Sequence, residues 1–127
     1  MSSPTVAILV RTKGRPRFLS RALENIAQQT FTDYTVCVIN DGGDEQATRA
    51  VIEASPLGSS RVQLLTTAGG NMEAASNAGL AATTSEYVAI HDDDDLWAPE
   101  FLERTVAALE ESGALMCTTR IVERYER

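Results

Sequence analysis

The segment TVAILV, residues 5–10, is a short apolar run rich in β-branched side chains, which is typical of a buried strand. Runs of the same type recur along the chain, at 34–40 (YTVCVIN), 61–66 (RVQLLT), 86–91 (EYVAIH) and 114–122 (ALMCTTRIV). Each is short enough for a strand and is bounded by polar or turn-forming residues. We therefore predict a strand at each of these positions.

Segments with helical spacing lie between these runs. Residues 16–29 carry apolar side chains at intervals of three and four, and they open with Pro16, which suits the first turn of a helix. Residues 99–112 repeat this pattern, also begin at a proline, and stop before Gly113, a residue common just past a helix end. Two weaker helical segments complete the alternation, at 44–55 and 71–84.

Strands that alternate with helices favour a mainly parallel sheet covered on both faces, because a right-handed helical crossover connects each strand to the next. The predicted fold class is therefore α/β, a Rossmann-like three-layer sandwich. The 127 residues suffice for one ordinary domain, and no repeat or low-complexity linker divides them. We predict a single domain over residues 1–127.

The composition excludes some classes of partner. The formal net charge of −7 should repel nucleic acid and anionic lipid, so we expect no nucleic-acid partner. No stretch approaches the roughly 18 apolar residues of a membrane span, and the first apolar run is too short for a signal peptide. By default, the expected localisation is cytoplasmic, with no transmembrane segment.

Two cysteines, Cys37 and Cys117, both lie inside apolar, strand-like segments. Neither has a second cysteine or a histidine at metal-ligand spacing. We predict that both are buried thiols.

Polar segments rich in glycine and aspartate follow four of the predicted strands. They are RTKGRP (11–16), NDGGD (40–44), TAGGN (67–71) and HDDDD (91–95). Ligands of open parallel sheets bind at the carboxyl ends of the strands, so these segments predict one binding site on that edge. The spacing of a dinucleotide-binding loop and of a P-loop is absent, which disfavours both of those phosphate cradles.

The acidic run Asp92–Asp95 needs an explanation, because adjacent carboxylates repel one another. Aspartates separated by one residue can both reach Mg²⁺ or Mn²⁺, and such an ion keeps open positions for phosphate oxygens. An EF-hand is excluded because Trp97 stands where its glycine belongs, and zinc lacks a second nitrogen or sulfur ligand. The run therefore predicts a metal-bridged phosphoester ligand, with a solvated acidic loop as the alternative.

Three residues near these segments have two interpretations each. Asp41 either hydrogen-bonds a base or ribose, or forms the turn before Gly42. His91 is more often a packed or capping residue than a metal ligand at such a position. Trp97 either lines the pocket or belongs to the core.

In order, these segments resemble the N-terminal, nucleotide-sugar-binding half of the family-two inverting glycosyltransferases, which have the GT-A fold. AILVRTKGRPRFLSRALENIAQQTFTDYTVCVINDGG (7–43) looks like that family's first strand, Thr-x-x-Arg-Pro loop, first helix and second strand. AASNAGLAATTSEYVAIHDDDDLWAPEFLE (74–103) looks like its Ala-Arg-Asn-x-Gly helix, fourth strand, DxD motif and following helix. The resemblance covers nearly the whole chain.

The resemblance implies a role for individual residues. Thr12 and Arg15 would form a wall around the nucleotide, and Asp41 would bind the base. Asp92, Asp93 and Asp94 would form the DxD motif, in which the last aspartate ligates the Mn²⁺ or Mg²⁺ ion that holds the diphosphate. The nucleotide-binding residues so implied are Thr12, Arg15, Asp41, Gly42, Asn77, Asp92 and Asp93, and the implied metal ligands are Asp92 and Asp94.

The sequence departs from the family pattern at several positions. Asn40 and Gly43 replace an aspartate and a serine of the second-strand loop, and Ser76 replaces an arginine that would reach the base. Arg11 stands where proline is common, and Lys13 and Gly14 stand where Tyr-Asn is common. The rim is therefore more cationic than usual, and a preference for uridine is open.

The resemblance implies sugar transfer from a nucleotide-diphosphate sugar to an acceptor that the sequence does not identify, whether saccharide, lipid or protein. Inverting transfer needs a base to deprotonate the acceptor hydroxyl. The family carries this base in its acceptor half, so we expect the base beyond residue 127 and this chain to be the donor-binding part. The alternatives are a non-catalytic nucleotide-binding or nucleotide-sugar-binding module and, less in keeping with a motif that no lysine follows, a haloacid-dehalogenase-type phosphatase.

Overall fold

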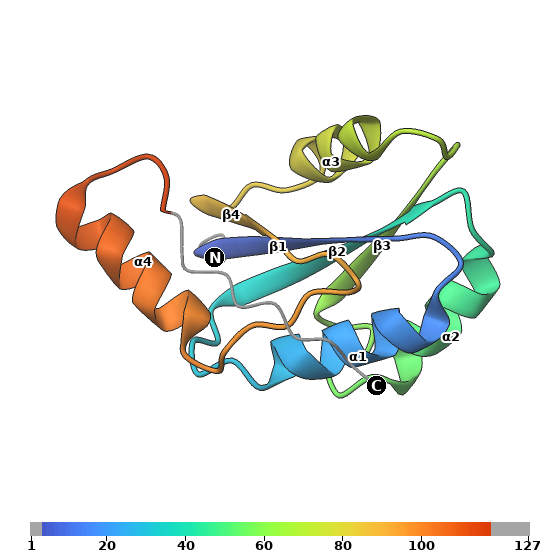
Figure 1. Cartoon of the computed structure of the whole chain (residues 1–127), viewed down its shortest axis with the longest axis horizontal. Helices are drawn as coiled ribbons and strands as arrows, with labels where there is room; N and C mark the ends of the chain where they lie inside the picture. The colour runs from blue at the N-terminus through green and yellow to red at the C-terminus, as the bar shows by residue number, and fades with distance from the viewer. Residues whose placement is uncertain (1–3, 118–127) are drawn as a thin grey trace.

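The computed structural model of the chain describes residues 4–117, which form a parallel sheet with helices on both faces (Figure 1). The elements in chain order are β1 (Val6–Thr12), α1 (Pro16–Ala27), β2 (Tyr34–Asp41), α2 (Glu45–Ala54), β3 (Val62–Thr67), α3 (Met72–Ala81), β4 (Tyr87–Ile90) and α4 (Phe101–Ser112). The strand order is β3-β2-β1-β4, and each neighbouring pair is parallel. The predicted α/β, Rossmann-like parallel sheet is confirmed.

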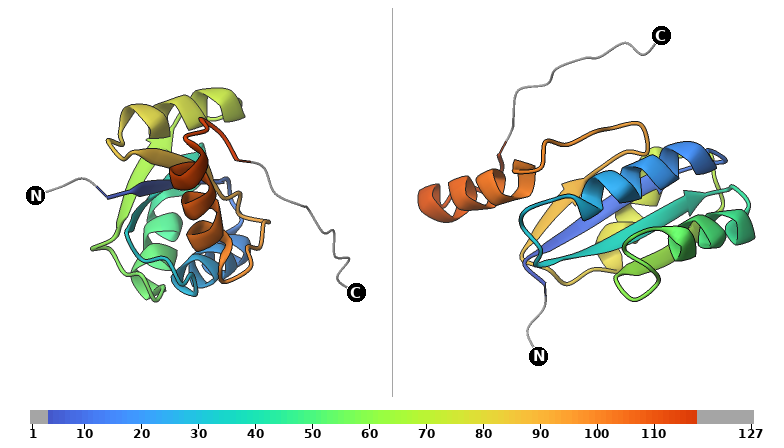
Figure 2. Two further views of the ribbon diagram at one scale, coloured as in Figure 1. Left: turned by 90° about the vertical axis from the view of Figure 1, so that its left-hand side faces the viewer. Right: turned by 90° about the horizontal axis from the view of Figure 1, so that it is seen from below.

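The helices form two outer layers around this sheet. α1 and α2 lie on one face and α3 on the other, as the end-on view in Figure 2 shows. β1 and β2 are the central strands, and their apolar side chains are buried on both faces. Because all strands run in one direction, their carboxyl ends meet at a single edge of the sheet.

The alternation of side chains along β1 separates two cores. Ile8 and Val10 pack with Leu23 and the rest of the α1 face, whereas Leu9 packs with Ala75 of α3 on the opposite face. Successive residues of a strand point to opposite faces, which produces this division. The alternation between the two faces continues beyond the strand ends, where it places successive polar side chains on opposite sides.

α3 packs closely against the sheet because a glycine, Gly79, lies at the contact. A Cβ atom on Gly79 would lie 2.8 Å from Ile39 Cδ1 and 3.1 Å from Leu9 Cδ2. A side chain at this position would push α3 away from β1 and β2. Gly79 therefore fixes the distance at which α3 packs.

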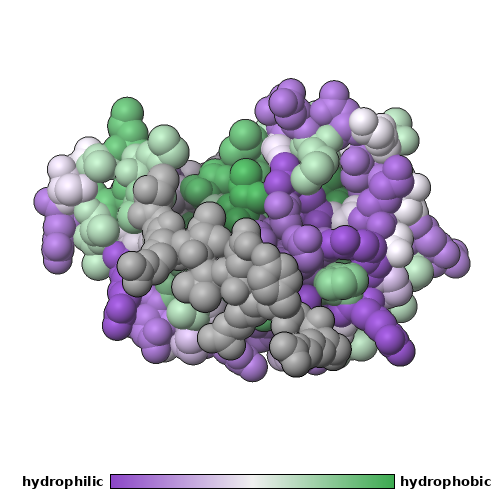
Figure 3. Space-filling model, viewed as in Figure 1, coloured by the Kyte–Doolittle hydropathy of each residue, from purple (hydrophilic) through white to green (hydrophobic). Residues whose placement is uncertain are grey.

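β4 forms one edge of the sheet and, within the described residues, pairs with β1 alone. Its Val88 and Ile90 side chains are 42% and 47% exposed, and Leu80 of the neighbouring α3 is 47% exposed. Figure 3 shows apolar surface between α3 and α4 on this side of the molecule. This edge thus presents apolar side chains to solvent.

The last predicted strand is wrong where the structure describes it. Residues 114–117 are exposed and extend from α4 without strand pairing, and residues 118–122 lie outside the described part. Gly113 ends α4 in the left-handed conformation, with φ of 67°. Cys37 is buried as predicted, but Cys117 is exposed, so the prediction of a buried thiol is wrong there.

The four predicted helices, at 16–29, 44–55, 71–84 and 99–112, all occur, with ends that agree with the prediction or differ from it by at most three residues. Across residues 4–117, no helix combines the length and the apolar composition that crossing a membrane requires.

Candidate functional site

A cavity of about 420 Å³ lies at the carboxyl ends of β1, β2 and β4. Its lining comprises three basic side chains, four aspartates, a threonine and a methionine, namely Arg11, Lys13, Arg15, Asp41, Asp92, Asp93, Asp94, Thr12 and Met72. Six of the residues predicted for the site therefore line one cavity. The other two, Gly42 and Asn77, are absent from this lining, and Asn77 is exposed on α3.

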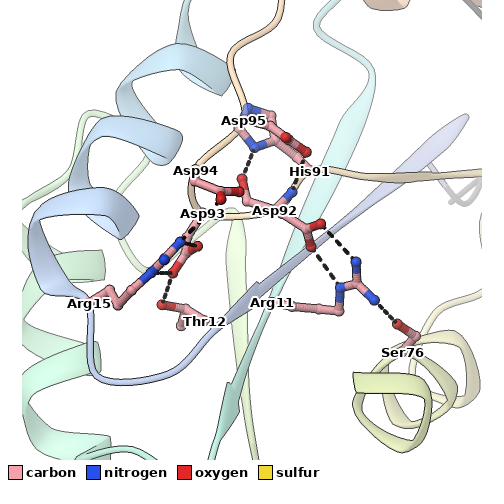
Figure 4. Close-up of polar contacts among 9 residues, drawn as sticks. All are labelled: Arg11, Thr12, Arg15, Ser76, His91, Asp92, Asp93, Asp94 and Asp95. Carbon is pink, nitrogen blue, oxygen red and sulfur yellow. Dashed lines mark hydrogen bonds and ion pairs between the residues drawn. The ribbon is translucent and has the colours of Figure 1, made fainter. Parts of the chain in front are cut away.

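The register between β1 and β4 distributes the aspartates over the two faces of the sheet. Leu9 is opposite Ile90, so Arg11 follows opposite Asp92. By the same count, Thr12 lies opposite Asp93. Arg11 and Asp92 consequently lie on the α3 side, and Thr12 and Asp93 on the α1 side, as Figure 4 shows.

Arg11 holds Asp92 through both carboxylate oxygens. Its Nε donates to Oδ1 at 2.7 Å and its Nη2 to Oδ2 at 2.8 Å, while Nη1 donates to Ser76 Oγ at 3.1 Å (Figure 4). The hydrogen bond to Asp92 raises the pKa of the Arg11 guanidinium, although burial opposes this shift. One charge of the acidic run is thus neutralised within the protein.

Asp93 is held on the other face by two residues of the first loop. Thr12 Oγ1 donates to its Oδ2 at 2.9 Å, Arg15 Nε donates to the same oxygen at 3.1 Å, and Arg15 Nη2 donates to Oδ1. The hydrogen bond to Asp93 raises the pKa of Arg15, with burial as the opposing effect. The guanidinium also lies over the ring of Phe18, with 4.4 Å between Cζ and the ring centroid.

The remaining two aspartates differ from each other. Asp94 has a side chain that is 58% exposed, and its Oδ2 lies 3.6 Å from Arg15 Nη2. Asp95 closes the turn, because its Oδ2 accepts the backbone N–H of Asp92 at 3.0 Å. The repulsion within the run is therefore offset by two arginines and a local turn, and Asp94 is left as the exposed carboxylate of the cavity.

His91 and Trp97 belong to the support beneath the acidic turn. His91 is fully buried, and its Nδ1 donates to the Asp92 carbonyl oxygen at 2.8 Å. Burial lowers the pKa of this imidazole. Trp97 packs against His91 and Phe101, with ring centroids 4.6 Å and 4.4 Å away, and is absent from the cavity lining. The packed interpretation of His91 and the core interpretation of Trp97 are both confirmed.

Asp41 is the last residue of β2, and it lines the cavity. Its Oδ1 accepts from Thr67 Oγ1 at 2.7 Å, which leaves Oδ2 for a ligand. Gly42 and Gly69 have φ of 87° and 93°, and a Cβ on Gly42 would lie 3.0 Å from Gly69 Cα. These glycines let the β2 and β3 loops meet backbone to backbone.

Asn40 has a structural role in the same loop. Its Nδ2 donates to the Gly43 carbonyl oxygen at 2.8 Å, and its Oδ1 accepts the Gly43 N–H at 3.0 Å. An aspartate at this position could accept the N–H but could not donate to the carbonyl. Asn40 therefore fastens the loop that carries Asp41.

The residues fit a divalent ion whose coordination is completed by a ligand or by water. Among residues 4–117, no three acidic, histidine or cysteine side chains are arranged to enclose a metal ion. Mg²⁺ and related ions are often held by one or two carboxylates, with phosphate oxygens and water completing the shell. The exposed Asp94 meets that requirement in a cavity of suitable size.

Comparison with known proteins identifies the family. The family model described as glycosyl transferase family 2 matches residues 7–127. The chain belongs to this family. Its membership over nearly the full length of the chain favours the glycosyltransferase interpretation of the acidic turn over the phosphatase interpretation.

Curated relatives carry the same family assignment in their names. The uncharacterized glycosyltransferase alr2836 of Nostoc sp. is 28% identical over 110 residues, which cover 87% of this chain and 34% of the relative. The chondroitin synthase of Pasteurella multocida is 26% identical over 114 residues, which cover 90% of this chain and 12% of that protein. The chain thus spans about a third or less of the length of these relatives.

Solved structures share the fold. The mannosyltransferase PcManGT from Pyrobaculum calidifontis, in complex with GDP-Man and Mn²⁺, is 26% identical with a TM-score of 0.72, and the match covers 86% of this chain and 33% of that one. S. aureus TarS 1-349 in complex with UDP is 19% identical with a TM-score of 0.75, over 86% of this chain and 33% of that one. The described part of the chain therefore has a GT-A-type, Rossmann-like fold.

Sequence reasoning missed the pairing of Arg11 with Asp92 and Ser76. The signal was present, because a parallel register that aligns the strands at 5–10 and 86–91 also aligns the residues two positions beyond Leu9 and Ile90. The departures from the family pattern at positions 11 and 76 were visible, but nothing in the sequence joined them.

Proposed function

We propose that this chain is the donor-binding part of an inverting glycosyltransferase. It binds a nucleotide-diphosphate sugar with Mn²⁺ or Mg²⁺, and the sugar passes to an acceptor hydroxyl. The observation that carries the proposal is the meeting of Thr12, Arg15, Asp41 and the acidic turn around one cavity at the carboxyl ends of the strands.

Charge supports a diphosphate ligand bound together with a cation. Three basic side chains and four carboxylates line the cavity, so the lining is close to neutral, with a slight excess of negative charge. A diphosphate would add further negative charge, and it therefore needs a cation beyond those of the protein. A bound divalent ion would supply positive charge that stabilises the departing diphosphate.

In this proposal, different protein groups bind different parts of the ligand. Asp94, the exposed carboxylate, is the metal ligand. The available Oδ2 of Asp41 accepts a hydrogen bond from the base or ribose, and Lys13, exposed on the rim, and Arg15 lie beside the phosphates. Thr12 holds Asp93, which in turn orients Arg15.

A similar protein that has been solved with a sugar donor supports this choice of donor. PcManGT has been solved with GDP-Man and Mn²⁺, a nucleotide-diphosphate sugar and a divalent ion. We extend that pair of ligand classes to this chain and leave the base and the sugar open. The base that deprotonates the acceptor is assigned, as a prediction, to the acceptor half of the protein.

A binding titration tests the proposal. The purified chain is titrated with GDP, UDP and ADP by calorimetry, with and without Mn²⁺, and Asp94→Asn is compared with Glu53→Gln, a matched loss of charge on the exposed face of α2. We expect metal-dependent binding in the wild type and in Glu53→Gln, weakened at least about tenfold in Asp94→Asn. Equal affinity in all three proteins, or no binding of any nucleoside diphosphate, would overturn the proposal.

A further inference from the structure

We propose that Thr67, the last residue of β3, is a positioning residue for the nucleotide, because it holds the Asp41 carboxylate in the orientation that receives the nucleoside. This inference rests on the proposed function, in which Asp41 binds the base or ribose. It gives β3 a part in donor binding although no residue of β3 lines the cavity.

The register of the sheet brings the two residues together. Asp41 and Thr67 are partners in the parallel pairing of β2 with β3, and each is the last residue of its strand. Partners in neighbouring strands lie about 5 Å apart with their side chains on the same face. Thr67 Oγ1 donates a hydrogen bond to Asp41 Oδ1 at 2.7 Å. The contact therefore follows from strand pairing and does not depend on a loop conformation.

The backbone beyond the two strands keeps this pair close. A Cβ atom on Gly42 would lie 3.0 Å from Gly69 Cα, so the segments that follow Asp41 and Thr67 are in direct contact. The two strand ends are thus held on both sides of the hydrogen bond, by the sheet before it and by the glycines after it.

The burial of Asp41 makes this hydrogen bond important. Asp41 is only 9% exposed, so little water can replace the threonine hydroxyl as a donor to Oδ1. Within residues 4–117, no second group donates a hydrogen bond to this carboxylate. Without the hydroxyl, the side chain would either keep an unpaired buried oxygen or rotate away, and both cost free energy.

Thr67 acts through Asp41 and does not touch the ligand itself. Asp41 lines the cavity and Thr67 does not. With Oδ1 bound to Thr67, Oδ2 is the oxygen that remains for a donor group of the nucleoside. An acceptor that is already oriented loses less side-chain entropy when the nucleoside binds, and affinity increases accordingly.

Thr66 provides a matched control on the same strand. Its Oγ1 donates to Glu45 Oε1 at 2.8 Å, which is also a threonine–carboxylate hydrogen bond. Successive residues of a strand point to opposite faces, and neither Thr66 nor Glu45 lines the cavity. Thr66→Val therefore removes the same kind of contact away from the site.

The first measurement follows the orientation of Asp41 in the chain without ligand. Vicinal couplings measured by NMR report the χ1 angle of this side chain. We expect one rotamer in the wild type, in Thr67→Ser and in Thr66→Val, and averaging between rotamers in Thr67→Val. A single unchanged rotamer in Thr67→Val, or averaging already in the wild type, would overturn the inference.

The second measurement is a double-mutant cycle on nucleotide affinity, by calorimetry with UDP and with GDP at saturating Mn²⁺. Thr67→Val should bind nucleotide about three- to tenfold more weakly, since Asp41 must then be ordered on binding. Thr67→Ser, which restores the hydroxyl, and Thr66→Val should remain within about twofold of the wild type. In an Asp41→Ala background, Thr67→Val should cause no further loss, because its effect passes through the carboxylate.

A residue with only a structural role would give a different result. Thr67→Val would then weaken binding by the same factor with and without Asp41, and that outcome would overturn the inference. Affinity for Mn²⁺ alone, followed by electron paramagnetic resonance, should be the same in Thr67→Val and the wild type. Thr67→Ala also lacks the hydroxyl, should behave as Thr67→Val does, and serves if the valine variant does not fold.

Failure of the inference differs from failure of the proposed function. The coupling measurement contains no nucleotide, so it tests the hold of Thr67 on Asp41 whether or not a nucleoside diphosphate binds. Absence of nucleotide binding in the wild type would overturn the donor-site proposal. Unchanged nucleotide affinity in Thr67→Val, with wild-type binding intact, would overturn the inference alone.

Discussion

The side-chain amide of Asn25 makes two hydrogen bonds to the backbone of Trp97, as donor to its carbonyl oxygen at 3.0 Å and as acceptor from its N–H at 2.8 Å. Asn25 Oδ1 also lies 2.9 Å from His91 Nε2. One residue of α1 therefore contacts the chain on both sides of the acidic turn. The position of Asp92–Asp95 depends on this contact as well as on the two arginines.

Replacing Asn25 by alanine should destabilise the fold. The backbone groups of Trp97 would lose their partner in a partly buried position, at a cost of about 1–3 kcal/mol in the free energy of unfolding. Urea denaturation measures this change. Glu24→Ala, at the exposed neighbouring position of α1, should remain within about 0.5 kcal/mol of the wild type, and an equal loss in both variants would contradict this role for Asn25.

Replacing Gly79 by alanine should also destabilise the protein, although alanine is the better helix former. The added methyl group would meet Ile39 Cδ1 and Leu9 Cδ2 at the face where α3 packs. Such overpacking costs about 1–3 kcal/mol. The gain in helix propensity from glycine to alanine is about 1 kcal/mol, which offsets only the lower end of that cost. Thermal unfolding measures the net effect. A more stable Gly79→Ala variant would show that α3 can shift without penalty.

Asp41 should govern nucleoside affinity and leave metal affinity unchanged. Asp41→Asn keeps the shape of the side chain but removes its charge, and loss of a charge-assisted hydrogen bond should cost about 1.5–3 kcal/mol of nucleotide binding. Calorimetry with nucleoside diphosphate and a separate Mn²⁺ titration measure the two effects. If the variant loses Mn²⁺ and keeps the nucleotide, the roles of the β2 loop and the acidic turn are reversed.

The two cysteines should differ in reactivity. Burial raises the pKa of the Cys37 thiol to about 11, so at pH 8 only roughly one molecule in a thousand carries the reactive thiolate even before access is considered. In Cys117→Ser, labelling of Cys37 by a thiol reagent should be slow in the native protein and rapid in urea. Raising the pH toward 11 should increase the native rate. Equal rates in native and unfolded protein at pH 8 would contradict the burial of Cys37.

Much of the fold was predictable because local signals agreed with the tertiary structure. TVAILV and the three following apolar runs are strands, and the helical spacing between them gives α1 to α4. ALMCTTRIV has the same local pattern, yet residues 114–117 are not a strand. A strand needs a neighbour, and a local sequence pattern does not contain the neighbour.

The site was predictable in outline and not in its pairings. Glycine- and aspartate-rich segments after successive strands indicated which residues gather at one edge. The separate pairing of Asp92 with Arg11 and of Asp93 with Arg15 depends on strand register and on the alternation of faces, which involve residues about eighty positions apart. Register is fixed by the packed sheet as a whole, so the sequence alone left these contacts undetermined.

The exposed edge at β4 bears on how the chain behaves when concentrated. A strand edge that has no neighbouring strand among residues 4–117 and carries apolar side chains such as Val88 and Ile90 can pair with the same edge of another molecule. Such a contact uses the same edge of both molecules, so it closes at a pair whose population grows with protein concentration. A lysine in place of Val88 would place charge on this edge and keep preparations of the chain monodisperse.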